Sequence, residues 1–167
     1  MVERQGGEED SNSPYEHTFL DTVIDSVNDD LFEHFQLKDG VTYSYSVIGF
    51  DLAGNLSDTI KVDSIHYDIT PPVLTLIYPY DDEAINNTSI SYATSEQLSA
   101  GDFLWTQTKG LIDTLSPHNI ELIADELSPN EKIKINLTNQ PLLNDGSYYS
   151  ILFTGIDLAG NESEPIL

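Results

Sequence analysis

The stretch that decides the fold occurs twice: residues 39–55 read DGVTYSYSVIGFDLAGN, and residues 145–161 read DGSYYSILFTGIDLAGN. The two copies begin 106 positions apart and match without a gap. At the same spacing Leu37 matches Leu143 and Ser57 matches Ser163. Residues 13–14 and 116–117, both Ser-Pro, match more weakly because three residues must be inserted. A repeat of this length indicates tandem structural units.

Each copy alternates with the period of two that a half-buried strand requires. We expect one face to point inward, with Tyr43, Tyr45, Val47 and Gly49 in the first copy and Tyr149, Ile151, Phe153 and Gly155 in the second. The Asp-Gly pair before each strand is a turn signal. The DLAGN run after it predicts a hairpin connection, in which Gly54 and Gly160 adopt positive φ.

A proline pair divides the chain. Residues 68–72 read DITPP, and two prolines stiffen an extended path and cannot lie in a central strand, so we predict a Pro-rich joint there. Residues 73–167 then form a complete repeat, and residues 13–67 form a partial one that is truncated at its N-terminus. We expect residues 1–12 to be disordered, and the chain to be a fragment.

Short apolar stretches separated by turn residues favour an antiparallel β-sandwich. The further strand candidates are residues 59–62, 73–78, 89–93, 103–108, 120–124 and 132–137, with another at the edge after Glu162. Helical spacing is weak everywhere, and the stretch from Asp21 to Phe35 is the one place where a helix is an alternative.

These motifs resemble a known family. LKDGVTY at 37–43 with DLAGN at 51–55, and the matching residues 143–149 and 157–161, resemble the end of a bacterial immunoglobulin-like or fibronectin type III-like tandem repeat. DITPP resembles the joint between such units. The resemblance implies an all-β, antiparallel sandwich in one complete unit preceded by a truncated one. It also implies a bacterial extracellular or cell-surface parent protein, with neighbouring repeats of that chain as partners.

Three aromatic residues have expected places in such a sandwich. Tyr43 and Tyr149 follow a leucine by six residues, so their hydroxyls can bond an upstream backbone group and brace the corner between two sheets. Trp105 occupies the place of the central core aromatic. The alternatives are ligand-facing tyrosines and a tryptophan that stacks on carbohydrate.

Composition excludes several partners and sites. Six basic against 29 acidic residues give a net charge of −23, which disfavours nucleic acid and anionic membrane surfaces. No apolar run is long enough to span a bilayer. The absence of cysteine excludes disulfides and thiolate chemistry. The first residues lack a signal peptide's basic start and apolar core, so we expect any export signal to lie outside this chain.

No sequence motif of an enzyme is present. The chain has no phosphate-binding glycine loop, no Gly-x-Ser-x-Gly and no His-Glu-x-x-His, and its four histidines are scattered. We therefore expect a non-enzymatic protein without catalytic residues or a bound organic cofactor.

Calcium is the one cofactor that the acidic residues suggest. Hard oxygen ligands near the ends of the units could collect at a joint; the candidates are Asp51, Asn55, Asp68, Asp157 and Asn161. The alternative is that the aspartates cap their own turns.

Self-repulsion at a net charge of −23 also predicts that added NaCl or CaCl2 stabilises the fold.

The function expected from these observations is a stalk or spacer, with a contribution to adhesion. One alternative is a module in which loops, including 101–102 and 52–55, bind a glycan or a protein. The other is an accessory domain of a secreted hydrolase. Exposed aromatics such as Tyr78, Tyr80 or Trp105 would favour the glycan binder.

Overall fold

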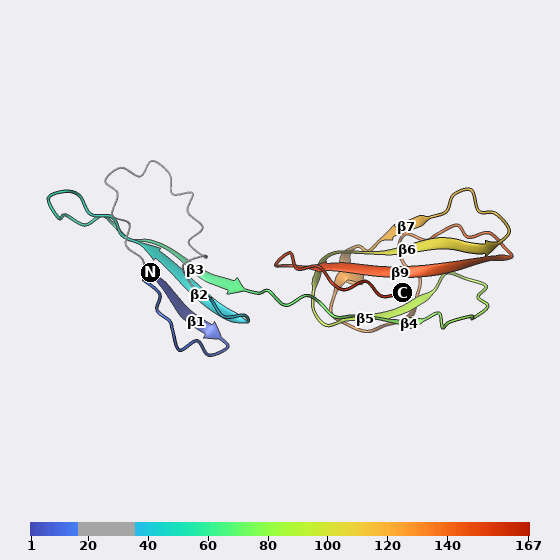
Figure 1. The fold of residues 1–167 in the computed structure, drawn as a ribbon, viewed down its shortest axis with the longest axis horizontal. Coiled ribbons are helices and arrows are strands. Elements are labelled where there is room, and N and C mark those ends of the chain that lie inside the picture. Colours follow the sequence, from blue (N-terminus) through green and yellow to red (C-terminus); the bar gives the residue numbers. More distant parts are fainter. Residues whose placement is uncertain (17–35) are drawn as a thin grey trace. The chain divides into compact units, whose positions relative to one another are not determined.

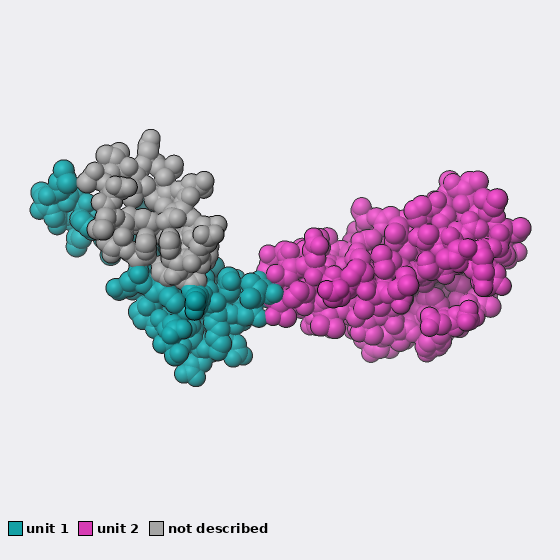
Figure 2. All heavy atoms as spheres, viewed as in Figure 1, with its two compact units in different colours: residues 1–69 teal, residues 70–167 magenta. Residues whose placement is uncertain are grey.

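The computed structural model describes residues 1–16 and 36–167, and in these ranges every regular element except one short 3-10 helix is a β-strand. The chain divides into two compact units, Met1–Ile69 and Thr70–Leu167 (Figure 2). Their boundary falls inside the proline-containing stretch 68–72. All strand pairs in both units are antiparallel. The predicted all-β, antiparallel class is therefore confirmed. The stretch from Asp21 to Phe35, where a helix is the alternative, lies outside the described residues.

Unit 1 contains one sheet in the order β1-β2-β3 (Figure 1), formed by Val2–Gly7, Val41–Val47 and Ile60–Tyr67. Its small core consists of Val2, Val41 and Tyr43. The prediction that residues 1–12 are disordered is wrong for residues 2–7. That segment pairs along β2 and buries Val2, which is only 3% exposed, so tertiary pairing overrides a composition that is poor in strand formers.

Unit 2 contains two three-stranded sheets (Figure 1). One has the order β4-β5-β8, formed by Leu74–Tyr78, Ile90–Thr94 and Lys132–Ile135. The other has the order β7-β6-β9, formed by His118–Glu121, Leu98–Gly110 and Ser147–Asp157. The 3-10 helix η1 covers Ala124–Leu127. None of the helices in the described part of the chain has the length and apolar character needed to cross a membrane.

The two sheets of unit 2 share one hydrophobic core. Tyr92 of β5 packs edge-on against Phe103 of β6 and Phe153 of β9, with ring centroids 5.2 and 5.4 Å apart. Phe103 and Phe153 stack on each other at 4.3 Å. Aromatic pairs in these geometries contribute about 0.5–1.5 kcal/mol beyond their buried area. Contact between the two sheets through apolar side chains is consistent with a β-sandwich.

The inward face that the sequence predicts is buried in unit 2 but only partly in unit 1. In β9, Ile151, Phe153 and Gly155 are buried, and Tyr149 is half-buried. In unit 1 the prediction is wrong for Val47, which is 39% exposed, and for Gly49, which is exposed. The described part of unit 1 has a single sheet, so no second sheet there covers these two residues.

Two segments differ from their predicted type. Gly101 and Asp102 were expected in a loop, but they lie inside β6, where Gly101 pairs with Gly155. The predicted strand over 120–124 ends at Glu121, and Ala124, with φ 51°, begins η1 instead. The binding-module alternative named two loops, 101–102 and 52–55. Because 101–102 lie within β6, only 52–55 is an exposed loop.

Candidate functional site

A hydrogen-bonded corner at the start of β9 joins this strand to the loop before it, to the loop after β6 and to β7. The Tyr149 hydroxyl accepts a bond from the backbone N–H of Asn144 (2.9 Å) and donates one to Asp113 Oδ2 (2.7 Å). The His118 Nε2 lies 2.7 Å from the same carboxylate oxygen, and the Leu115 N–H donates to Asp113 Oδ1 at 3.0 Å. The Asp113 side chain is only 2% exposed. The hydroxyl thus bonds the upstream backbone and a buried carboxylate together.

Unit 1 contains the same corner with the same bonds. The Tyr43 hydroxyl accepts from the Lys38 N–H (2.9 Å) and donates to Asp10 Oδ2 (2.6 Å). The Asn12 N–H donates to Asp10 Oδ1 (3.0 Å), and Tyr15 takes the place of His118 by donating its hydroxyl to Asp10 Oδ2 (3.0 Å). We call these two arrangements the tyrosine corners.

A serine beside each corner extends the match. The Ser13 hydroxyl accepts from the Arg4 N–H of β1 at 2.7 Å, and the Ser116 hydroxyl accepts from the Gln107 N–H of β6 at 2.8 Å. Each serine precedes a cis proline. The weak Ser-Pro match in the sequence therefore marks equivalent positions, and β1 corresponds to the second half of β6.

The corner carboxylates are held in their ionised form. Hydrogen bonds from Tyr149 and then His118 lower the pKa of Asp113 to about 2, against the opposing effect of burial. The bond from Tyr43 likewise lowers the pKa of Asp10. Burial, followed by the bond to Asp10, raises the pKa of Tyr43 to about 12. A neutral phenol donating to an anionic carboxylate is a charge-assisted hydrogen bond, one of the stronger kinds in proteins.

Sequence reasoning located the tyrosines and missed their aspartate partners. The signal was present, because residues 10–14 read DSNSP and residues 113–117 read DTLSP, 103 positions apart. The aspartates lie far from the tyrosines in sequence, so their pairing is visible only once β1 and β6 are aligned with each other.

The two DLAGN loops also repeat each other. Asp157 Oδ1 accepts from the N–H groups of Ala159, Gly160 and Asn161 at 2.7–2.9 Å, and its Oδ2 accepts from the Asn161 side chain at 2.8 Å. Burial raises the pKa of Asp157, but these bonds outweigh it and leave that pKa below its usual value. Gly160 has φ 96°, which suits a residue without a Cβ.

In unit 1 Asp51 closes its loop in the same way. Its Oδ1 accepts from the N–H groups of Ala53 and Asn55, and its Oδ2 accepts from the Asn55 side chain at 2.7 Å. The Asn55 bonds lower the pKa of Asp51. Gly54 has φ 88°. Both carboxylates thus use their oxygens on their own turns.

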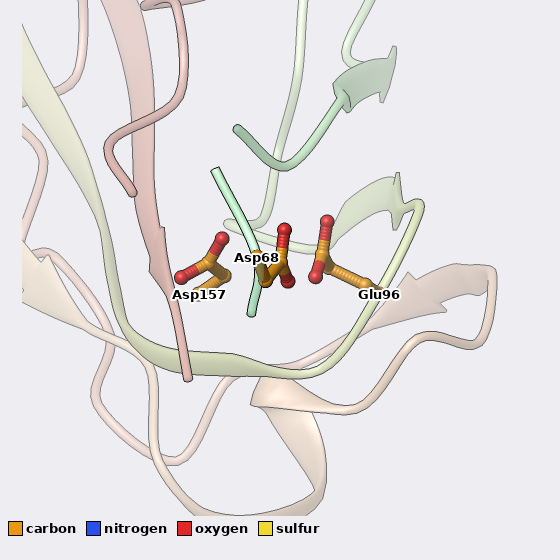
Figure 3. A group of neighbouring side chains, drawn as sticks. All are labelled: Asp68, Glu96 and Asp157. Atoms are coloured by element: carbon orange, nitrogen blue, oxygen red, sulfur yellow. The ribbon is translucent and has the colours of Figure 1, made fainter. Parts of the chain in front are cut away.

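The remaining calcium candidate is Asp68. Figure 3 shows Asp68, Glu96 and Asp157, each of which offers a carboxylate oxygen of the kind that calcium prefers. Asp68 belongs to unit 1, whereas Glu96 and Asp157 belong to unit 2. Unit 2 alone supplies two of these carboxylates, and the one on Asp157 already accepts four bonds from its loop. This acidic group carries no argument for a bound metal.

The aromatic candidates for glycan binding do not form an exposed platform. Trp105 is 2% exposed and Tyr78 is 9% exposed, while Tyr80 is exposed and contacts Tyr78 edge-on. Tyr149 is half-buried and its hydroxyl belongs to the corner. Trp105 lies 6.5 Å from the Tyr149 ring, as part of the core.

Comparisons of the chain with protein-family models, with curated proteins and with solved structures find no match.

Proposed function

We propose that this chain is a pair of immunoglobulin-like or fibronectin type III-like tandem repeats, the first of them partial, that serve as a non-enzymatic spacer in a bacterial surface or secreted protein. The observation that carries the proposal is the duplicated tyrosine corner. Both corners use a tyrosine, an upstream N–H, an aspartate and a Ser-Pro in the same bonds. A structural element that recurs in successive units is typical of repeat proteins, in which each unit contacts only its neighbours.

The path of the chain through a unit supports a spacer. In unit 2 the chain begins β4 at Leu74, and a Cβ placed on Gly155, near the end of β9, would lie 3.4 Å from Leu74 Cδ2. In unit 1 the chain leaves through β3, whose last residue Tyr67 pairs with Val41 at the start of β2. Since β2 and β9 are equivalent, a repeat receives the chain at one end of its long strand and releases it at the other.

This path gives each repeat a definite reach. Between Ser147 and Gly155, β9 is about 26 Å long at ~3.3 Å per residue. The Pro-containing stretch 68–72 adds about 15 Å when extended. A spacer made of such units therefore lengthens by about 40 Å with each repeat, and the high negative charge of the chain opposes its collapse onto itself.

The test uses the period of 106. Residues 62–167 make up one full period, so a second copy of them can be attached after Leu167 without breaking the repeat phase. We expect small-angle X-ray scattering to show the maximum dimension rising by about 40 Å for one added period and by twice that for two. The matched control replaces Pro71 and Pro72 by glycine in each joint, which lowers the increment because glycine linkers are flexible coils. An unchanged maximum dimension on adding periods contradicts the spacer.

A further inference from the structure

The outer edge of β9, opposite β6, is paired along one half only. Phe153 exchanges backbone hydrogen bonds with Ile166, at 2.8 and 3.0 Å, midway along the strand. Alternate residues of a strand direct their N–H and C=O groups to the same edge. Ile151 and Tyr149 therefore present theirs beside Phe153, and no other strand in the described part of the chain pairs with them on that edge.

Unit 1 shows what lies at the equivalent edge. There Val47 pairs with Ile60, which matches the Phe153 and Ile166 pair at the same spacing of 106. β3 then continues along β2, with Val62 beside Tyr45 and further pairs up to the first residue of β2. On the equivalent edge of β9, the pair that corresponds to the start of β3 is the one between Phe153 and Ile166.

A hollow of ≈1480 Å³ lies beside this half of β9 within unit 2. Its lining includes Leu76 of β4, Ile151 and Tyr149 of β9, and Ile166. Trp105 also lines it, and the indole N–H of this buried side chain has no hydrogen-bond acceptor among the described residues. A strand edge, apolar side chains and a buried donor without a partner together favour an extended peptide.

We propose that one extended strand of the β3 type completes the Tyr149–Ile151 edge of β9, in the place that β3 takes on β2. In the register of unit 1, Val62 lies opposite Ile151, Ile65 opposite Tyr149, and Tyr67 opposite Ser147. Val62 and Ile65 are apolar, as are the Leu76, Ile151 and Ile166 side chains that line the hollow. The proposal rests on the same equivalence of units as the proposed function, and it names the chemistry of the partner segment.

The test attaches the six residues of Val62–Tyr67 directly after Leu167 of the full chain, where they continue the strand in the repeat register. The control carries the same addition with proline in place of its valine and isoleucine, because proline cannot donate to a ladder. We expect backbone amide exchange at Ile151 and Tyr149 to slow at least ~10-fold relative to the control, with a shift in Trp105 fluorescence.

Equal exchange rates in the two extended chains overturn the proposal. Protection of the same amides in the unextended chain that rises with protein concentration identifies a second copy as the occupant, and also overturns it. The six added residues contribute no new unit. Their outcome therefore bears on the β9 edge alone, while the scattering experiment bears on the reach of the repeats.

Discussion

Replacing Tyr149 by phenylalanine removes the hydroxyl of the unit 2 corner while leaving its ring in the core. The lost donor pairs with a carboxylate that is 2% exposed, at 2.7 Å, and hydrogen bonds to charged groups contribute about 1.5–3 kcal/mol. The bond from the Asn144 N–H adds little, because that group is exposed and water replaces the hydroxyl. We expect the free energy of unfolding of unit 2 to fall by about 2 kcal/mol.

The assay is urea unfolding followed by tryptophan fluorescence. Trp105 is the single tryptophan of the chain and lies in the core of unit 2, so the signal reports on this unit. A loss of about 2 kcal/mol lowers the urea midpoint by about 1 M or more. Tyr148→Phe is the matched control, because Tyr148 is 55% exposed and its ring contact with Lys109 survives the change. If the two variants agree within about 0.5 kcal/mol, the corner does not brace unit 2.

Three further predictions concern acid, backbone geometry and salt. The pKa of Asp113 in the folded state is lowered from 3.8 to about 2, chiefly by the bond from Tyr149, so its contribution to stability is present above pH 3.8 and is lost as the pH falls toward 2. Asp113→Asn should therefore flatten the acid side of a plot of urea midpoint against pH. An unchanged slope contradicts this. Gly110→Ala should lower the thermal midpoint more than Gly160→Ala does. Both residues have positive φ, but only at Gly110 would an added Cβ clash with a backbone oxygen, that of Gly146. Equal losses in the two variants would refute the reasoning. Raising NaCl should raise the thermal midpoint by screening a net charge of −23, whereas a flat midpoint shows that self-repulsion is not significant.

The strands could be predicted wherever alternation and turn residues coincide. The segments around Tyr43 and Tyr149 meet both conditions, and each forms a strand. β1 could not be predicted, because residues 2–7 read VERQGG and the strand depends on pairing with β2, more than thirty residues away. Gly101 could not be placed correctly for a related reason. From the sequence alone a glycine indicates a turn, but in β6 the missing Cβ leaves room for the Leu98 and Leu122 side chains beside Gly101.

The corner could be predicted only in part. Spacing from Leu37 and Leu143 located the tyrosines, since that pattern is local. Asp10 lies in the loop after β1 and Asp113 in the loop after β6, far in sequence from the tyrosines of β2 and β9. Nothing in the segment that contains each tyrosine specifies an acidic partner. The aspartates of the DLAGN loops were weighed as calcium ligands or as turn caps. Their bonds to their own loops follow the second pattern.

The path of the chain from one end of the long strand to the other also determines how a repeat carries tension. A pull applied through Leu74 and through a strand leaving beside Ser147 acts along β9, nearly perpendicular to its ladder of hydrogen bonds. Those bonds are then loaded in shear, many at once, and cannot be unzipped one after another. Rupture under such a load requires the simultaneous loss of the ladder that holds the departing strand, which in unit 1 is the ladder between β3 and β2 and pairs six positions.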